Sequence, residues 1–173
     1  MFSLRPVAMG IMTVALLVLA TSISTDEWYS VTTVAKRKFN GLWNHCVQMS
    51  GRDTSCNFLR GWEPISDDTM TAIRGFFALA ILFQLGAIIY PPFYKQMASG
   101  IVKLEFMAIL CLIATCFAFL GMIIITHEVI HHNEGPTFGW SYYLGWAGTG
   151  VSAVGAALGA ISTRDDVYMD QGM

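Results

Sequence analysis

Charged side chains are scarce in this chain, and their scarcity excludes several classes of protein. Asp, Glu, Lys and Arg make up 13% of the 173 residues, whereas a soluble domain carries about a quarter. The 10 basic and 12 acidic residues give a formal net charge of −2, so there is no basic field to attract nucleic acid, and no nucleic-acid-binding motif occurs. Hydrophobic residues reach 54%, and the mean hydropathy is +0.53. The composition indicates a membrane protein, and the length allows one domain.

The few charges are concentrated in one part of the chain. Twelve of the 22 lie between Asp26 and Arg74, six of each sign. Runs with few or no charges occupy most of the remainder, and each approaches the roughly 20 residues that cross a bilayer as a helix. We predict four membrane spans, at residues 6–24, 70–90, 104–126 and 140–162.

Flanking residues refine two of these spans. Arg5 precedes the first run, as a charged residue precedes the apolar part of a signal peptide, but no clear A-x-A cleavage site follows, so we favour a membrane helix. After the second run, Pro91 and Pro92 predict the end of the helix, because proline donates no helical hydrogen bond.

The fourth run is rich in small residues at helical spacing. Such residues let helix backbones approach closely in lipid, where packing replaces the hydrophobic driving force. The alternative is that glycine and alanine are simply common in membrane helices. We predict that this helix packs tightly through Gly148, Ser152, Gly155, Ala156 and Gly159.

Four spans place both termini on the same side of the membrane. The short segments beside the first, second, third and fourth runs carry Lys or Arg, whereas residues 127–139 carry none, and this asymmetry favours cytoplasmic termini. The long loop also carries Lys and Arg residues, and these weaken the difference in basic charge between the two sides of the membrane. We expect extracytoplasmic loops at residues 25–69 and 127–139, and a cytoplasmic tail at residues 163–173.

The cysteines give a second indication of orientation. Cys46 and Cys56 lie in the long polar loop, whereas Cys111 and Cys116 lie inside the third run. A disulfide between the loop cysteines would persist only in an oxidising compartment. It would stabilise the loop by roughly 3 kcal/mol in the chain-entropy model. A metal site is the alternative, but the spacing differs from the C-x2-C of zinc ligands. We favour the disulfide and expect no cofactor.

The long loop also contains strand signals. Residues 28–34 are rich in β-branched and aromatic side chains, residues 39–49 can form one strand or two, and residues 55–59 would pair back after a turn signal at 50–53. The disulfide would then staple a hairpin. The expected fold, a single domain over residues 1–173, is an all-α membrane four-helix bundle with a small antiparallel extracellular β-sheet.

A basic tripeptide interrupts these strand signals. Lys36, Arg37 and Lys38 form either a basic patch that faces ions or a partner, or a solubilising turn between strands. Balanced charge elsewhere in the loop leaves the sign of any ion selectivity open.

The long loop contains a W…GLW…C…C signature, and an arginine stands at the entry of the second helix; these residues are Trp28, Gly41, Leu42, Trp43, Cys46, Cys56 and Arg74. This pattern resembles the first extracellular loop of claudins. That family belongs to a superfamily with peripheral myelin, epithelial membrane and lens fibre tetraspans and the gamma-type channel auxiliary subunits. Residues 139–146 are similar to the entry of the fourth helix. The resemblance implies a claudin-like bundle capped by an extracellular sheet of about five strands.

The resemblance also implies a function without catalysis. Members seal or gate the space between cells, adhere, shape membranes or modulate channels. We expect a multi-pass plasma-membrane protein at cell junctions that contacts membrane lipid and pairs with itself or with related tetraspans, laterally or across cells. The alternative is an auxiliary subunit of an ion channel or receptor. Nucleic acid is not an expected partner.

One segment matches a metal-ligand pattern. HEVIH, from His127 to His131, has the H-E-x-x-H spacing of zinc proteases and places two histidines on one helical face. A protease would need a third ligand and a cleft open to water. The other interpretations are opportunistic binding of metal or protons and a solvated helix end. We favour the last and assign no enzymatic activity.

Overall fold

Four helices and five short strands make up the part of the chain that the structure describes. The computed structural model describes residues 4–33, 36–49, 54–58, 65–97, 104–132 and 137–170. The helices are α1 (Leu4–Ser24), α2 (Asp67–Met97), α3 (Leu104–His132) and α4 (Trp140–Asp170). The strands are β1 (Tyr29–Thr33), β2 (Lys36–Asn40), β3 (Asn44–Met49), β4 (Ser55–Phe58) and β5 (Thr137–Phe138).

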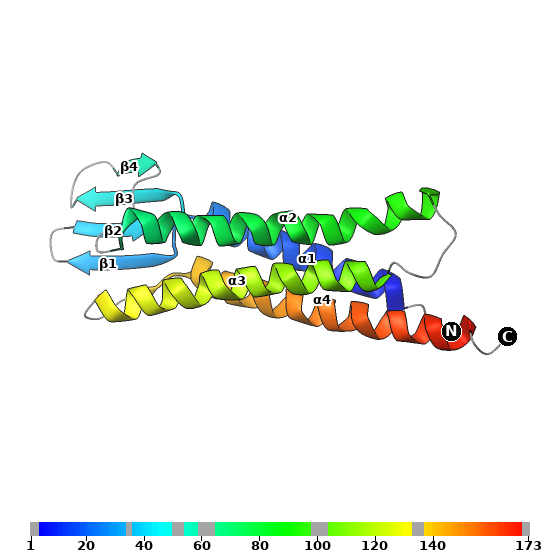
Figure 1. Ribbon diagram of the computed structural model, residues 1–173. Coiled ribbons are helices and arrows are strands. Elements are labelled where there is room, and N and C mark those ends of the chain that lie inside the picture. The colour runs from blue at the N-terminus through cyan, green and yellow to red at the C-terminus, as the bar shows by residue number, and fades with distance from the viewer. Residues whose placement is uncertain are drawn as a thin grey trace.

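The helices run side by side along one axis, and the sheet covers one end of the bundle (Figure 1). Neighbouring helices pack in the order α1, α4, α3, α2, and α2 closes the ring on α1. The start of α1 and the end of α4 both lie at the end opposite the sheet (Figure 1). The predicted fold class, a four-helix membrane bundle with a small antiparallel sheet, is confirmed.

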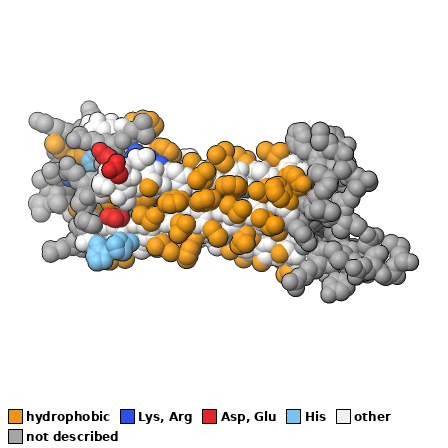
Figure 2. Space-filling view, in the orientation of Figure 1, with side chains coloured by type: hydrophobic (Ala, Val, Ile, Leu, Met, Phe, Trp, Pro, Cys, Tyr) orange, Lys and Arg blue, Asp and Glu red, His pale blue; other side chains and the backbone are white. Residues whose placement is uncertain are grey.

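The surface of the bundle suits a lipid environment. Four of the described helices are long and apolar enough to cross a membrane, over Pro6–Ser24, Asp67–Tyr90, Phe106–His131 and Trp140–Ser162. Large apolar side chains face outward from them, and a band of hydrophobic side chains covers the middle of the molecule (Figure 2). In lipid such exposure is favourable, because the surrounding acyl chains are as apolar as the side chains.

Polar side chains within the helices are hydrogen-bonded locally. Thr13 and Thr21 of α1 donate to the carbonyl oxygens of Met9 and Leu17, four residues earlier. At the start of α2, the Ser66 hydroxyl accepts a hydrogen bond from the Thr69 amide, which caps the helix. These bonds matter because lipid offers no water to an unsatisfied polar group.

Helix α2 continues beyond the paired prolines. It runs to Met97, so the prediction that Pro91 and Pro92 end the helix is wrong. Each proline lacks the hydrogen bond that its nitrogen would donate, here toward residues 87 and 88, and its ring crowds the same carbonyl group, but membrane helices tolerate such gaps. Helices α3 and α4 also continue, to His132 and Asp170, into segments that we predicted as the second loop and the tail.

The five strands form one antiparallel sheet in the order β4–β3–β2–β1–β5. The strands predicted at residues 28–34 and 55–59 are confirmed where the structure describes them, and the 39–49 region divides into the end of β2 and β3. Residues 36–38 lie in β2, so their interpretation as a turn is wrong. The turn predicted at 50–53 lies outside the described residues.

Candidate functional site: the sheet cap

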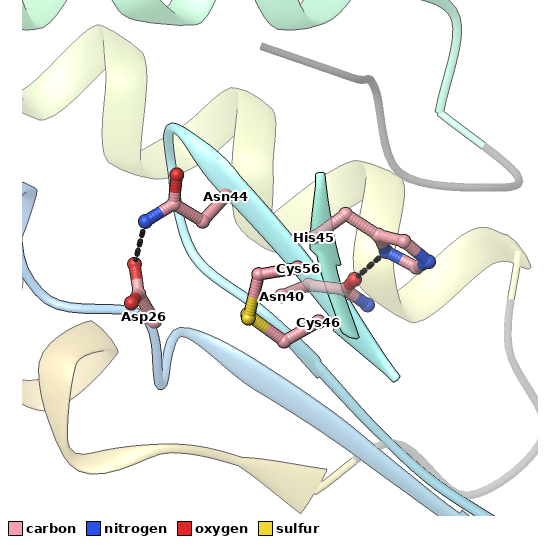
Figure 3. The surroundings of a disulfide bond; sticks show 6 residues. All are labelled: Asp26, Asn40, Asn44, His45, Cys46 and Cys56. Carbon is pink, nitrogen blue, oxygen red and sulfur yellow. Dashed lines mark hydrogen bonds between the residues drawn. A yellow bond between two sulfur atoms is a disulfide. The ribbon is translucent and has the colours of Figure 1, made fainter. Parts of the chain in front are cut away.

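The disulfide joins the edge of the sheet to its interior. We call β1–β5, with the described residues that connect them, the sheet cap. Cys46 and Cys56 lie directly opposite each other on β3 and β4 and are bonded through their sulfurs (Figure 3). The side chains of all four β4 residues are exposed. Because β4 contributes little to any apolar core, the disulfide is its main side-chain attachment to the sheet.

A close approach of two backbones fixes the turn between β2 and β3. A Cβ atom added to Gly41 would lie 2.6 Å from the Cα atom of Asp26, so only glycine fits at this position. The Asp26 carboxylate in turn accepts a hydrogen bond from the Asn44 side chain at 2.9 Å (Figure 3). Nearby, the His45 ring is hydrogen-bonded to the buried Asn40 side chain. These contacts tie the start of β3 to the segment that follows α1.

Trp28 anchors the sheet cap on the bundle. Its side chain is 1% exposed, and its indole Nε1 donates a 2.8 Å hydrogen bond to the Ser22 carbonyl oxygen near the end of α1. Its ring packs edge-on against Phe77 of α2, with the centroids 5.5 Å apart. The adjacent Tyr29 is also buried, and burial raises the pKa of its hydroxyl, so the group stays neutral at physiological pH.

Leu42 and Arg74 make a second anchor. Leu42 is fully buried in the cluster below the sheet, beside Met70, Ile73 and Phe77. Its carbonyl oxygen accepts a 2.9 Å hydrogen bond from Nε of Arg74 on α2. The Arg74 guanidinium also lies 5.6 Å from the centre of the Trp43 ring, within the range of a cation–π contact. The GLW segment is therefore held by an arginine at the sheet end of α2.

Strand β5 joins the segment between α3 and α4 to the segment between α1 and α2. Thr137 and Phe138 pair with Ser30 and Tyr29, and the Gly139 amide donates to the Trp28 carbonyl oxygen at 3.0 Å. A Cβ atom added to Gly139 would lie 1.8 Å from the carbonyl oxygen of Glu27, so this position also requires glycine. No strand signal marks this short segment, which is why analysis of the residues alone missed it.

The outer part of the sheet cap is accessible. Strand β4 is one of the two edge strands, and the Phe58 side chain at its end is 70% exposed. On β2, the exposed Arg37 side chain lies over the Phe39 ring, with the guanidinium carbon 4.5 Å from the ring centre. An exposed edge strand with one large apolar side chain, and a basic side chain on β2, are thus presented on a support that is bound to the bundle.

The predicted small-residue face of α4 is buried within the chain. A Cβ atom added to Gly148 would lie 2.9 Å from the Leu19 side chain, and one added to Gly155 would lie 3.0 Å from Met12. Gly159 approaches Met12 as well as Met107 and Ala108 of α3. Ala156 joins the buried cluster around Met12. Helix α4 meets α1 through glycines because a larger side chain would push the helices apart.

Ser152 belongs to a polar cluster inside the bundle. The fully buried Gln84 of α2 accepts a 3.0 Å hydrogen bond from the Ser152 hydroxyl and donates a 3.2 Å bond to the Met12 carbonyl oxygen of α1. Ser152 also pairs with Thr115 of α3 at 2.8 Å, and the buried Cys111 thiol lies 3.6 Å from Gln84. We call these side chains the Gln84 cluster. Sequence reasoning missed it, although a lone glutamine in an apolar run was a usable signal.

The histidines of the HEVIH segment lie at the sheet end of α3. The rings of His127 and His131 are 4.4 Å apart between centroids. Among the residues that the structure describes, no group of three or more His, Cys, Asp or Glu side chains could hold a metal ion. The pattern of a zinc protease is therefore incomplete in the described part of the chain.

A four-span membrane protein with a disulfide-stapled sheet at one end is the class that this fold defines. The sequence profile of the PMP-22/EMP/MP20/Claudin family matches residues 3–158. The chain therefore belongs to this family, as its loop signature indicated. Among individual curated proteins, none matches the chain significantly.

Proposed function

We propose that this chain is a non-enzymatic, claudin-like protein of the plasma membrane that acts in cell–cell contact, adhesion or the paracellular barrier through its sheet cap. The observation that supports this most is the combination of firm anchoring and an exposed edge. Trp28 and Arg74 bind the sheet cap to the bundle, whereas β4 and Phe58 are exposed. A surface held in this way can meet a partner with little loss of conformational entropy.

The proposed orientation has the sheet cap outside the cell and both termini in the cytoplasm. The disulfide supports it, because such a bond persists only in an oxidising compartment. After mild reduction, an impermeant thiol reagent should label Cys46 and Cys56 in intact cells. Labelling that requires permeabilised cells would contradict this orientation.

The edge strand offers a route to association with other copies or related tetraspans. The outer backbone groups of an edge strand can pair with another chain, and natural proteins usually protect them. Here β4 forms the edge opposite the short strand β5, and its terminal Phe58 presents an apolar side chain to solvent. We propose lateral association in one membrane through this edge.

The alternative role is that of an auxiliary subunit of an ion channel or receptor. It would use the small-residue face of α4 to bind foreign membrane helices. Gly148, Gly155 and Gly159 are buried against helices of the same chain. That face is therefore already occupied, which favours the contact role.

Expression in non-adherent cells that form no junctions separates the two roles. The contact role predicts enrichment of tagged protein where two expressing cells touch. Phe58→Ser should reduce that enrichment severalfold, whereas Thr32→Ala, an exposed position on β1 at the opposite side of the sheet from β4, should leave it unchanged. Uniform distribution, together with co-purification of a channel whose gating changes, would contradict the proposal.

A further inference from the structure

Two histidines lie side by side near the end of α3. The ring centroids of His127 and His131 are 4.4 Å apart, and the ring planes are inclined by 46°. Both side chains are exposed, and a spacing of four residues puts them on the same helical face. Histidine side chains gather at the end of the molecule that carries the sheet, beyond the apolar band (Figure 2). A solute at that end therefore has access to the pair.

The separation of the rings suits a shared metal ion. Zinc binds a histidine nitrogen at about 2.0–2.1 Å, so two imidazole ligands of one ion have ring centres about 4.5–5.2 Å apart. The observed 4.4 Å is close to this range. Binding would require one nitrogen of each ring to turn toward a common ion. Imidazole suits Zn²⁺, Cu²⁺ and Ni²⁺, and it is a poorer ligand for Mg²⁺ and Ca²⁺.

The position in the helix also favours a cation. The last four carbonyl groups of a helix lack intrahelical donors, and they give the C-terminal end a partial negative charge. Helix α3 ends at His132, so His131 lies in its last turn. Glu128 follows His127 in the sequence but lies about 100° further around the helix. Glu128 also precedes His131 by three residues, so it borders the face that carries the pair, and its negative charge would favour a nearby cation.

We propose that His127 and His131 form a binding site for one divalent transition-metal ion, Zn²⁺ or Cu²⁺, with water as the remaining ligands. In the described part of the chain, no third protein ligand joins the pair. A closed structural zinc site has four protein ligands, and a zinc hydrolase usually has three. The proposed site thus has two protein ligands from the described residues, and the proposal assigns it metal binding rather than hydrolysis. This inference does not depend on the proposed role at cell contacts.

Metal titration of the protein in nanodiscs tests this site directly. The full chain, without a polyhistidine tag, is titrated separately with Zn²⁺ and Cu²⁺ and followed by calorimetry. We expect one ion per chain. His127→Ala and His131→Ala should each weaken binding at least tenfold, because even the loss of an outer-shell partner costs about 10- to 100-fold in metal affinity. His132→Ala and His45→Ala are matched controls that should retain the original affinity.

Three results would overturn the proposal. They are an absence of binding by the unaltered chain, unchanged affinity in the double variant His127→Ala/His131→Ala, and an equal loss of affinity in the His132→Ala control. Circular dichroism of each variant checks that the helices remain folded. Because the titration uses no cells, its outcome is separate from that of the contact experiment.

Discussion

The sheet cap and the helix bundle solve the same problem of buried polar groups by different means. In the sheet cap, backbone groups pair between segments far apart in sequence, as β1 does with β5. In the bundle, most backbone groups bond within their own helix, so side chains decide how the helices meet. The sheet cap therefore depends on a covalent bond and on glycines at close approaches, whereas the bundle depends on small residues and on polar contacts between helices such as the Gln84 cluster.

The cost of a single substitution differs between the two regions. A strand such as β4, with no buried side chain, has few contacts to replace a lost one. A helix in lipid retains its hydrogen bonds after a side chain is altered. We therefore expect changes in the sheet cap to have larger effects than changes of similar size in the bundle.

Loss of the disulfide should have the largest effect. The double variant Cys46→Ser/Cys56→Ser should destabilise the folded sheet cap by about 3 kcal/mol, because the loop between the cysteines regains its freedom in the unfolded state. Amide hydrogen exchange in β3 and β4 should become faster, while exchange in the four helices stays slow. Cys116→Ser, an exposed free cysteine of α3, is the control. Unchanged exchange in β3 and β4 would show that other contacts hold this edge.

Gly139→Ala should have the next largest effect. The Cβ atom of the new alanine would lie 1.8 Å from the carbonyl oxygen of Glu27. Neither atom is the end of a flexible side chain that could turn aside, so the backbone at this position must move. We expect a loss of about 1–3 kcal/mol, as for other overpacked positions. Thermal unfolding in nanodiscs measures the change.

The matched control for this substitution is Gly150→Ala. An added Cβ atom at Gly150 meets nothing within 4 Å. Alanine is a better helix former than glycine by about 1 kcal/mol, so this variant should be as stable as the original or more so. If the two variants were equally destabilised, the close approach at Gly139 would not be the cause of the loss of stability.

Gln84→Met should have the smallest effect of the three. The substitution preserves volume but removes the hydrogen bonds to Ser152 and to the Met12 carbonyl oxygen. Hydrogen bonds between membrane helices average about 0.6 kcal/mol and reach about 1.7, so we expect a loss of about 1 kcal/mol. Unfolding in nanodiscs, compared with the lipid-facing control Leu82→Met, measures it. A loss of stability larger than that of the disulfide variant would show that the bundle, and not the sheet cap, is more sensitive to substitution.

The helices could be predicted because lipid permits few alternatives. An apolar run of about 20 residues must form its hydrogen bonds within itself, so composition alone indicates a helix. The ends of the helices were harder to predict. Nothing in the composition indicated that α2 would pass through Pro91 and Pro92, because the cost of two missing hydrogen bonds depends on what surrounds them.

The sheet cap could be predicted in part. The β-branched segment around Tyr29 and the pairing of Cys46 with Cys56 followed from local signals. Strand β5 did not, because two residues carry no periodicity and their pairing with β1 spans more than 100 positions. The hydrogen bond from Arg74 to the Leu42 carbonyl oxygen could not be predicted either, because every residue has a backbone carbonyl and its identity does not indicate which one accepts.

By itself, the sequence determined that four helices cross a membrane, that one polar segment carries a disulfide, and that the W…GLW…C…C signature belongs to this family. These follow from composition and local spacing. Only the tertiary structure decided that Gly148 and Gly155 face α1, that Gln84 connects the helices, and that Gly139 closes on Glu27. Those contacts join residues distant in the chain, and their energies depend on which surfaces meet when the helices pack.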